Sequence, residues 1–251
     1  MKWCCSFPNR NYLKSTLLVF TTIFVLVSLS QAAEGRKIEF RTLCLEHVGG
    51  IEKVFITNDD GGIGPEVPLY TDISPVVQGV FKSNAAAFYV EKAGPDGKPM
   101  LELVGKATIG KSERQLFLFL PGEKGEGKPV YRVQSFDDDT RTFGMGFIRA
   151  INLAPVPVRF DISGVISPEV IPGRYIQFPH SKKVNDYNIY PVVVEFKSAS
   201  GEWLKGQSVG WKATNLRREV VVTLIDSQFK QPVVRVYSDF PPWMESTPEG
   251  S

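Results

Sequence analysis

The feature that most constrains the fold of this chain is an internal duplication. The segment Pro129–Ser135 (PVYRVQS) is matched 103 residues later by Pro232–Ser238 (PVVRVYS). Four further matches occur in the same order at offsets of 103 to 108 residues: Pro65–Val67 with Pro168–Val170, Val90–Glu91 with Val194–Glu195, Lys106–Thr108 with Lys212–Thr214, and Arg41-x-Leu43-x-Leu45 with Arg149-x-Ile151-x-Leu153. A nearly constant offset with small drifts indicates tandem repeats that differ in loop length. We expect two repeats, near 37–140 and 145–241.

The residue pattern inside each repeat is typical of an all-β fold. Short runs rich in Val, Ile, Phe and Leu, such as Val192–Phe196 and Val220–Ile225, alternate with turn signals such as Gly94–Gly97 and Ser198–Gly201. No segment after the N-terminal region shows a sustained helical period of apolar residues. About seven short strands per repeat favour a β-sandwich of the immunoglobulin-like type over a closed barrel.

One strand is apolar on both of its alternating faces. It contains Leu116, Phe117, Leu118 and Phe119, followed by Leu120. Because an ordinary sandwich strand has one polar face, the outer face of this strand is expected to be covered. The cover is either the other repeat or a second chain, so these residues are candidate interface residues. A central strand beneath a loop is the alternative.

The N-terminal segment predicts export. Residues 1–32 contain Lys2, Arg10 and Lys14, no acid, an apolar run over 15–29 and small residues before Ala33. This is the layout of a secretory signal peptide, and the apolar run is shorter than the roughly 20 residues of a comfortable membrane span. We expect a periplasmic or extracellular protein without a stable membrane span. An uncleaved N-terminal anchor is the alternative.

Removal of residues 1–32 changes both charge and cysteine content. The whole chain has 29 basic and 27 acidic residues, a net charge of +2. All three cations of the segment are lost with it, so the remainder is close to neutral. Such a balance argues against nucleic acid as a partner. Cys44 then remains as the sole cysteine, in an apolar strand, and is expected to be buried.

No residue pattern predicts a catalytic, cofactor or metal site. Gly206–Gly210 (GQSVG) matches the nucleophile-elbow pattern around Ser208, but no histidine follows it and no helix is expected there. His47 and His180 lack partners at metal-ligand spacing. Asp137–Asp139 between the repeats is expected to be a solvated acidic linker, with a Ca²⁺ site as the alternative. We therefore expect no enzyme activity.

Four aromatic residues of the second repeat are candidate ligand-binding residues. Trp203 and Trp211 align near Pro99 and Gly105, so the first repeat has no large aromatic residue at either place. They could stack on a sugar or peptide, together with Tyr187 and Tyr190, or pack within the protein. A disordered tail is expected over 242–251.

The opening of the second repeat, Arg149–Gly164 (RAINLAPVPVRFDISG), resembles the first hairpin of small exported bacterial immunoglobulin-like domains of unassigned function. The resemblance covers about 16 residues. It implies an exported sandwich and assigns no catalytic residue.

These observations together predict an exported, non-enzymatic structural or protein-interaction module of the cell envelope. Its expected partner is an envelope protein or a second copy of the chain. The alternative is an accessory protein that binds a carbohydrate or peptide through the tryptophan face of the second repeat.

Overall fold

The computed structural model describes residues 35–58, 61–94, 97–123, 125, 127–226 and 229–243. These residues form strands, turns and loops, with no helix among them, so the described chain is all-β as predicted. The described part contains no helix with the length and apolar character needed to cross a membrane. The predicted signal peptide, 1–32, lies outside the described residues.

Each repeat contributes eight strands. The first repeat contains β1 (Arg36–Cys44), β2 (Lys53–Thr57), β3 (Ile63–Pro68), β4 (Val77–Phe81), β5 (Ala85–Ala93), β6 (Pro99–Thr108), β7 (Arg114–Pro121) and β8 (Tyr131–Asp137). The second contains β9 (Phe147–Asn152), β10 (Val158–Ile162), β11 (Val165–Ile166), β12 (Tyr175–Pro179), β13 (Ile189–Lys197), β14 (Trp203–Lys212), β15 (Arg218–Ile225) and β16 (Pro232–Asp239).

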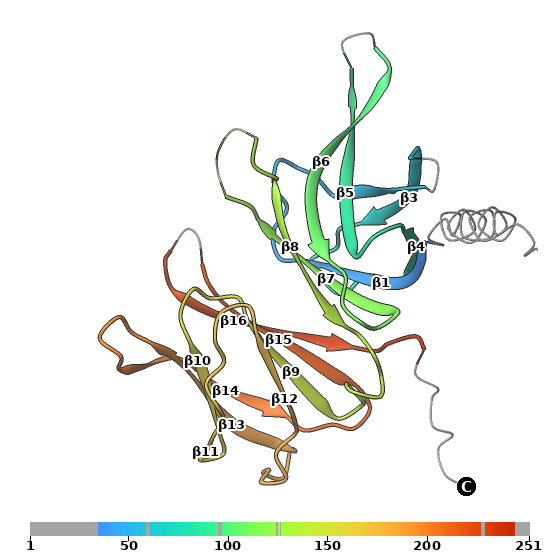
Figure 1. Cartoon of the computed structure of the whole chain (residues 1–251). Helices are drawn as coiled ribbons and strands as arrows, with labels where there is room; N and C mark the ends of the chain where they lie inside the picture. The colour runs from blue at the N-terminus through green and yellow to red at the C-terminus, as the bar shows by residue number, and fades with distance from the viewer. Residues whose placement is uncertain are drawn as a thin grey trace, which may run out of the picture.

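The strands form four sheets of four, two in each repeat. In the first repeat the sheet orders are β4-β1-β7-β8 and β3-β2-β5-β6, and in the second β12-β9-β15-β16 and β11-β10-β13-β14. The second pair repeats the first with every strand number raised by eight. Even the exceptional parallel pairing recurs, between β1 and β7 and between β9 and β15. The duplication is therefore a duplication of topology (Figure 1).

The strand ladders correct one detail of the sequence alignment. Arg41 pairs with Leu116 and Arg149 with Val220, which makes β7 and β15 equivalent residue by residue. On the next strand Leu118 pairs with Gln134, and its counterpart Val222 pairs with Arg235. Arg235 thus corresponds to Gln134 and not to Arg132, as the matching letters suggest. A shift of two residues keeps every side chain on its face of the sheet.

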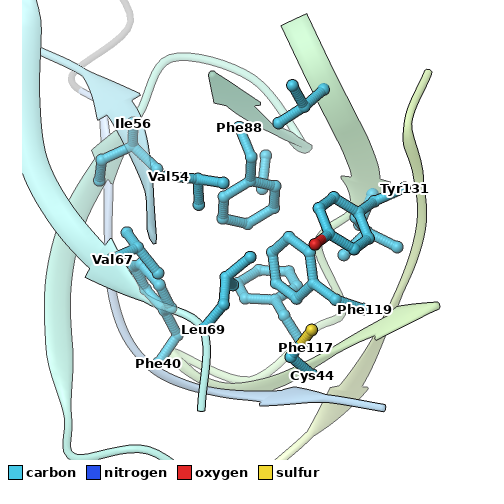
Figure 2. Close-up of a cluster of buried hydrophobic side chains, with 14 of the residues drawn as sticks. Phe40, Cys44, Val54, Ile56, Val67, Leu69, Phe88, Phe117, Phe119 and Tyr131 are labelled. Carbon is cyan, nitrogen blue, oxygen red and sulfur yellow. The ribbon is translucent and has the colours of Figure 1, made fainter. Parts of the chain in front are cut away.

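The core of the first sandwich is aromatic (Figure 2). Phe88 lies at its centre, with ring centroids 5.2 Å from Phe117 and 4.9 Å from Phe119 in edge-to-face geometry. Tyr131 closes the group, 5.6 Å from Phe119. Its hydroxyl accepts a hydrogen bond from Val48 N and donates one to Ile51 O. Burial of these rings supplies apolar area while the one polar atom is satisfied.

A separate apolar cluster lies between the two repeats. Leu116, Leu118 and Leu120 of β7 pack there with Val220 and Val222 of β15. Side chains alternate along a strand, so the neighbouring Phe117 and Phe119 point into the first sandwich instead. Of the four candidate interface residues, the structure thus places Leu116 and Leu118 against the second repeat and Phe117 and Phe119 in the core of the first.

Candidate functional site: a buried ion cluster between the repeats

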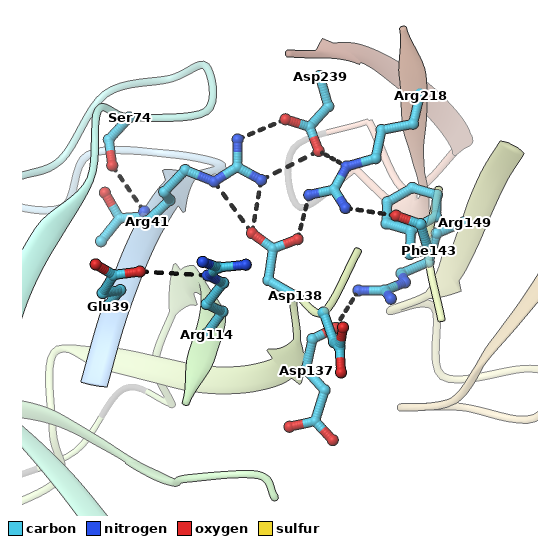
Figure 3. A network of polar contacts seen from close by, with 12 residues as sticks. Glu39, Arg41, Ser74, Arg114, Asp137, Asp138, Phe143, Arg149, Arg218 and Asp239 are labelled. Atoms are coloured by element: carbon cyan, nitrogen blue, oxygen red, sulfur yellow. Dashed lines mark hydrogen bonds and ion pairs between the residues drawn. The ribbon is translucent and has the colours of Figure 1, made fainter. Parts of the chain in front are cut away.

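The apolar cluster ends at four charged side chains, two from each repeat (Figure 3). Arg41 lies on the outer face of β1, and Asp138 directly follows β8. Arg218 begins β15, and Asp239 ends β16. None of the four side chains is more than 3% exposed. We call these four residues the ion cluster.

Each carboxylate of the ion cluster binds both guanidinium groups. Asp138 Oδ2 accepts from Arg41 Nε at 3.1 Å and Nη2 at 2.6 Å, and Asp138 Oδ1 accepts from Arg218 Nη2. Asp239 accepts from Arg41 Nη1 at 2.5 Å and Nη2 at 3.1 Å, and also from Arg218 Nε. Such charge-assisted bonds in a dry site are short and strong, and they close a ring that spans both repeats.

Electrostatics within the ion cluster favours the charged state. Burial by itself lowers the pKa of Arg41, but hydrogen bonds and charges from Asp239 and Asp138 outweigh it and raise the pKa above its ordinary value. Arg218 donates a further bond to Phe143 O at 2.7 Å. A sealed, mutually neutralised quartet of this kind can hold two sheets in one orientation. It offers no reachable group to a substrate.

A third buried guanidinium, that of Arg149 on β9, has no carboxylate bonded to it among the described residues. It donates from Nη1 to Asp137 O at 2.7 Å. In the amide orientation that satisfies both groups, the Gln177 oxygen accepts from Nε and Nη2 at 3.1 and 3.0 Å. The pKa of Arg149 is lowered to about 10, mainly by burial, and the negative charge of Asp138 offsets part of this effect. Arg149 is therefore held by dipoles and aromatic rings.

Two aromatic rings cover the buried arginines, and each ring follows one repeat while the arginines that it covers belong to the other. Phe143 follows the last strand of the first repeat and lies 4.2 Å from the guanidinium carbon of Arg149 and 4.3 Å from that of Arg218. Trp243 follows the last strand of the second repeat and lies 4.8 Å from Arg41 and 5.0 Å from Arg114. The ladders make Arg41 equivalent to Arg149 and Arg114 equivalent to Arg218. The aromatic residue after each repeat therefore covers the arginine pair of the other.

The position of Trp243 corrects the predicted tail. The sequence predicts a disordered segment over 242–251, but Trp243 packs on two arginines of the first repeat. Residues 244–251 lie outside the described residues.

The linker aspartates also differ from both expectations. Asp137 Oδ1 accepts from Gln115 Nε2 at 2.7 Å and from Ser112 N at 2.9 Å, whereas Asp138 belongs to the ion cluster. Asp139 pairs with Arg141. Asp138 is buried, which is wrong for a solvated linker, and the three carboxylates take separate protein partners. No group of three or more His, Cys, Asp or Glu among the described residues is arranged to hold a metal.

Two of the four candidate ligand-binding aromatics are core residues, which corrects the prediction for them. Trp211 is 5% exposed and packs on Phe178, and Tyr190 is fully buried with its hydroxyl 2.8 Å from His180 Nδ1. Both occur at inward-facing positions of the second sandwich. They therefore offer no stacking face to a ligand.

The other two aromatics lie elsewhere on the surface. Tyr187 is 76% exposed in the loop before β13. The ring of Trp203 is contacted by two cations, Arg159 at 4.4 Å and Lys197 at 5.4 Å. The structure does not bring Trp203, Trp211, Tyr187 and Tyr190 together on one face.

Ser208 lies in the middle of β14, paired with Val193, and not at a strand-to-helix turn. Its flanking glycines have packing reasons. A Cβ at Gly206 would lie 2.5 Å from the Phe196 ring, and one at Gly210 would lie 2.8 Å from Ile189. The two glycines on either side of Ser208 are therefore explained by the side chains of Phe196 and Ile189, which leave no room for a Cβ at positions 206 and 210.

The fold and the ion cluster define this chain as a duplicated pair of β-sandwiches joined through a buried ionic interface. No protein-family model matches the chain, and no curated protein sequence matches it.

Proposed function

We propose that this chain is an exported, non-enzymatic structural or protein-interaction module of the cell envelope, in which the two sandwiches act as one rigid body. The observation that carries the proposal is the sealed ion cluster beside an apolar layer, both shared between the repeats. Domains that move relative to one another usually share a small, polar and hydrated interface. The present interface contains an apolar cluster, and none of its four ion-cluster side chains is more than 3% exposed.

Further contacts across the joint support rigidity. Arg235 on β16 donates to Leu45 O at the end of β1, at 2.7 Å. The linker is fixed as well, because Asp138 N donates to Arg114 O and Phe143 N donates to Asp139 O. A spacer with fixed geometry would present surfaces of both repeats to a partner in a constant arrangement.

Export rests on the sequence of residues 1–32, with an uncleaved membrane anchor as the alternative. A single cysteine in the remaining chain is compatible with an oxidising compartment, because no internal disulfide is needed or formed. Stability would then come from the apolar clusters, and the ion cluster would fix the orientation of the two repeats.

Two measurements test the proposal. For export, the tagged full chain is expressed and fractionated. We expect it in the envelope or outside the cell, with a mass that starts at Ala33. Retention inside the cell with an intact N-terminus overturns export, and a membrane-bound chain of full mass selects the anchor.

For rigidity, spin labels are placed at Glu52→Cys and Lys205→Cys, which are exposed positions in different repeats. Double electron–electron resonance should give one narrow distance distribution. A broad distribution that matches a flexible joint would overturn the rigid-body proposal. The same label pair in an Asp239→Ala background is the matched variant, and it should broaden the distribution.

A further inference from the structure

A large open cleft lies next to the ion cluster on the first repeat. Its volume is about 1070 Å³. Its walls come from the outer face of the sheet at β1 and β4, from the turn between β6 and β7, and from the linker: Lys37–Glu39, Gln78–Val80, Lys111–Arg114 and Asp139–Arg141. Thr57, Asn58 and Pro65 complete the far end.

The edge strand β4 runs along this cleft with free backbone groups. Glu39 N donates to Glu113 O on the β7 side, so the alternate residues Ile38 and Phe40 direct their backbone groups to β4. Their partners on β4 are Gly79 and Val77. The intervening residues Gln78 and Val80 therefore turn their N–H and C=O groups away from β1. Within the described chain β4 pairs only with β1.

Among the edge strands of the described chain, β4 is the one without a protective feature in its own sequence. Proteins guard exposed edges with proline, charge, bulges or very short strands. The described sheets have seven other edge strands. Six of them contain proline or a charged residue, namely β3, β6, β8, β12, β14 and β16, and the seventh, β11, is only two residues long. The sequence of β4, Val77–Phe81 (VQGVF), contains neither.

β4 is also a firm platform. A Cβ at Gly79 would lie 2.5 Å from Ile56 Cδ1 and 3.2 Å from the Phe40 ring, so glycine lets the strand lie tightly on the core. Phe81 at its end is buried against Phe40, with ring centroids 6.0 Å apart. A rigid edge loses little entropy when a further strand pairs with it.

The charges of the cleft favour an acidic ligand. Arg114 is paired with Glu39 and Arg141 with Asp139. Lys37 and Lys111 have no ion pair or side-chain hydrogen bond with the described residues. Glu113 is the one acidic residue of the lining that likewise has neither with the described residues. The unpaired cations outnumber the unpaired acids.

We propose that β4 accepts an extended, acidic segment of a partner protein by strand addition. The backbone of the segment pairs with Gln78 and Val80, and its carboxylates meet Lys37 and Lys111. Main-chain bonds then provide affinity, and alternate side chains provide specificity. The inference rests on the interaction function proposed above and names the site and the partner class for it.

The experiment selects ligands from a displayed library of random twelve-residue peptides against the protein purified after expression of the full chain. Selected peptides should be acidic and rich in β-forming residues. Binding of synthetic copies, followed by fluorescence anisotropy, should fall as salt rises. Methylation of alternate peptide nitrogens should abolish binding in one register and spare it in the other, because only one set of N–H groups faces β4.

Variants locate the site. Val80→Pro removes one outward N–H and should weaken binding about tenfold or more. Ile166→Pro is the matched control: Ser167 N donates to Phe160 O, so Ile166 on the edge strand β11 also turns its N–H outward. It should bind as the unaltered protein does. Lys37→Glu with Lys111→Glu tests the charges without a backbone change, and should weaken binding about three- to tenfold at low salt.

Several outcomes overturn the proposal: no enrichment of peptides, enriched peptides without acidic residues, equal binding by Val80→Pro and Ile166→Pro, or insensitivity to N-methylation. Dimerisation that Val80→Pro abolishes would assign β4 to a second copy of the chain instead. A protein that is exported and rigid but shows one of these outcomes loses only this inference. The proposed function then stands on its own two measurements.

Discussion

Replacement of Asp239 by alanine should destabilise the protein far more than an ordinary surface change. In the native state Asp239 accepts bonds from both Arg41 and Arg218. Without it two guanidinium groups, neither more than 3% exposed, share the single carboxylate of Asp138. The buried charge of Arg149 lies beside them. The variant therefore leaves an uncompensated cation in a dry interface.

The size of the effect follows from that imbalance. Removal of one partner from a buried ion pair lowers the free energy of unfolding by about 3–5 kcal/mol. For a domain of 150–250 residues, 1 kcal/mol corresponds to roughly 2–4 °C in the unfolding midpoint. Asp239→Ala should thus lower the thermal midpoint by about 6–20 °C. Urea unfolding followed by tryptophan fluorescence should show a lower midpoint concentration.

Two controls make the prediction specific. Asp139→Ala removes the neighbouring linker aspartate, whose partner Arg141 is 88% exposed at its side chain, and should cost less than about 1 kcal/mol. Joint replacement of the whole ion cluster by Met and Leu should be neutral or stabilising by about 1–4 kcal/mol. Equal losses for Asp239→Ala and Asp139→Ala would refute the reasoning. A quadruple variant as unstable as Asp239→Ala would show that the charges themselves stabilise the joint.

Four further outcomes are expected. Leu118→Ala, which opens a cavity between the repeats, should cost about 2–5 kcal/mol in urea unfolding. Burial raises the pKa of the Cys44 thiol, so Ellman's reagent should modify it only after denaturation. Burial also raises the pKa of Tyr131 to about 12, so the unfolding free energy should fall as the pH rises from 10 toward 12. Tyr131→Phe should reduce this loss, and the remainder comes from Tyr190 and Tyr237, whose pKa values burial also raises. Acrylamide quenching of fluorescence should decrease more in Trp203→Phe than in Trp211→Phe, because only the first ring is partly exposed.

The sequence was sufficient to predict the class of fold, because strand alternation and duplication can both be recognised from the order of residues without knowing which strands pair. The apolar run Leu116–Leu120 indicated a strand covered on both faces, and the structure has a core on one side and the second repeat on the other. The register of β16 was not predictable from matching letters. Arg132 and Arg235 share a residue type but occupy different ladder positions.

The prediction that Trp211 binds a ligand was wrong because its ring fills volume in the core of the second sandwich. The first sandwich fills its core from β7 with Phe117 and Phe119, where the second has Val221 and Thr223 at the equivalent positions of β15. The missing volume is supplied from the opposite sheet by Trp211. The absence of a large aromatic in one copy therefore signalled compensation across the core and not a ligand site.

The ion cluster could not be assembled from the sequence, because its members are far apart along the chain. Arg41 is separated from Asp138 by 97 residues and from Asp239 by 198. The one available signal was an arginine at matching places in two apolar strands, Arg41 and Arg149. Such a residue needs buried partners, but only the topology shows that the carboxylates of Arg41 come from the ends of β8 and β16.

The order of the two copies along one chain explains why their equivalent outer faces differ. The outer faces of the two repeats are equivalent in topology, and both contribute side chains to the apolar cluster between the repeats. The linker that leaves the first repeat crosses the outer face of the second before β9 begins. Two contacts lie along this path. Phe143 packs on Arg149, and in the amide orientation given above Gln177 Nε2 donates to Thr142 O at 2.6 Å. In the described chain the corresponding face of the first repeat has Trp243 over its arginines and then the open cleft beside β4. Covalent connection thus makes two equivalent faces unequal: the linker lies on the face of the second repeat, and the face of the first keeps an open cleft, where we have proposed strand addition.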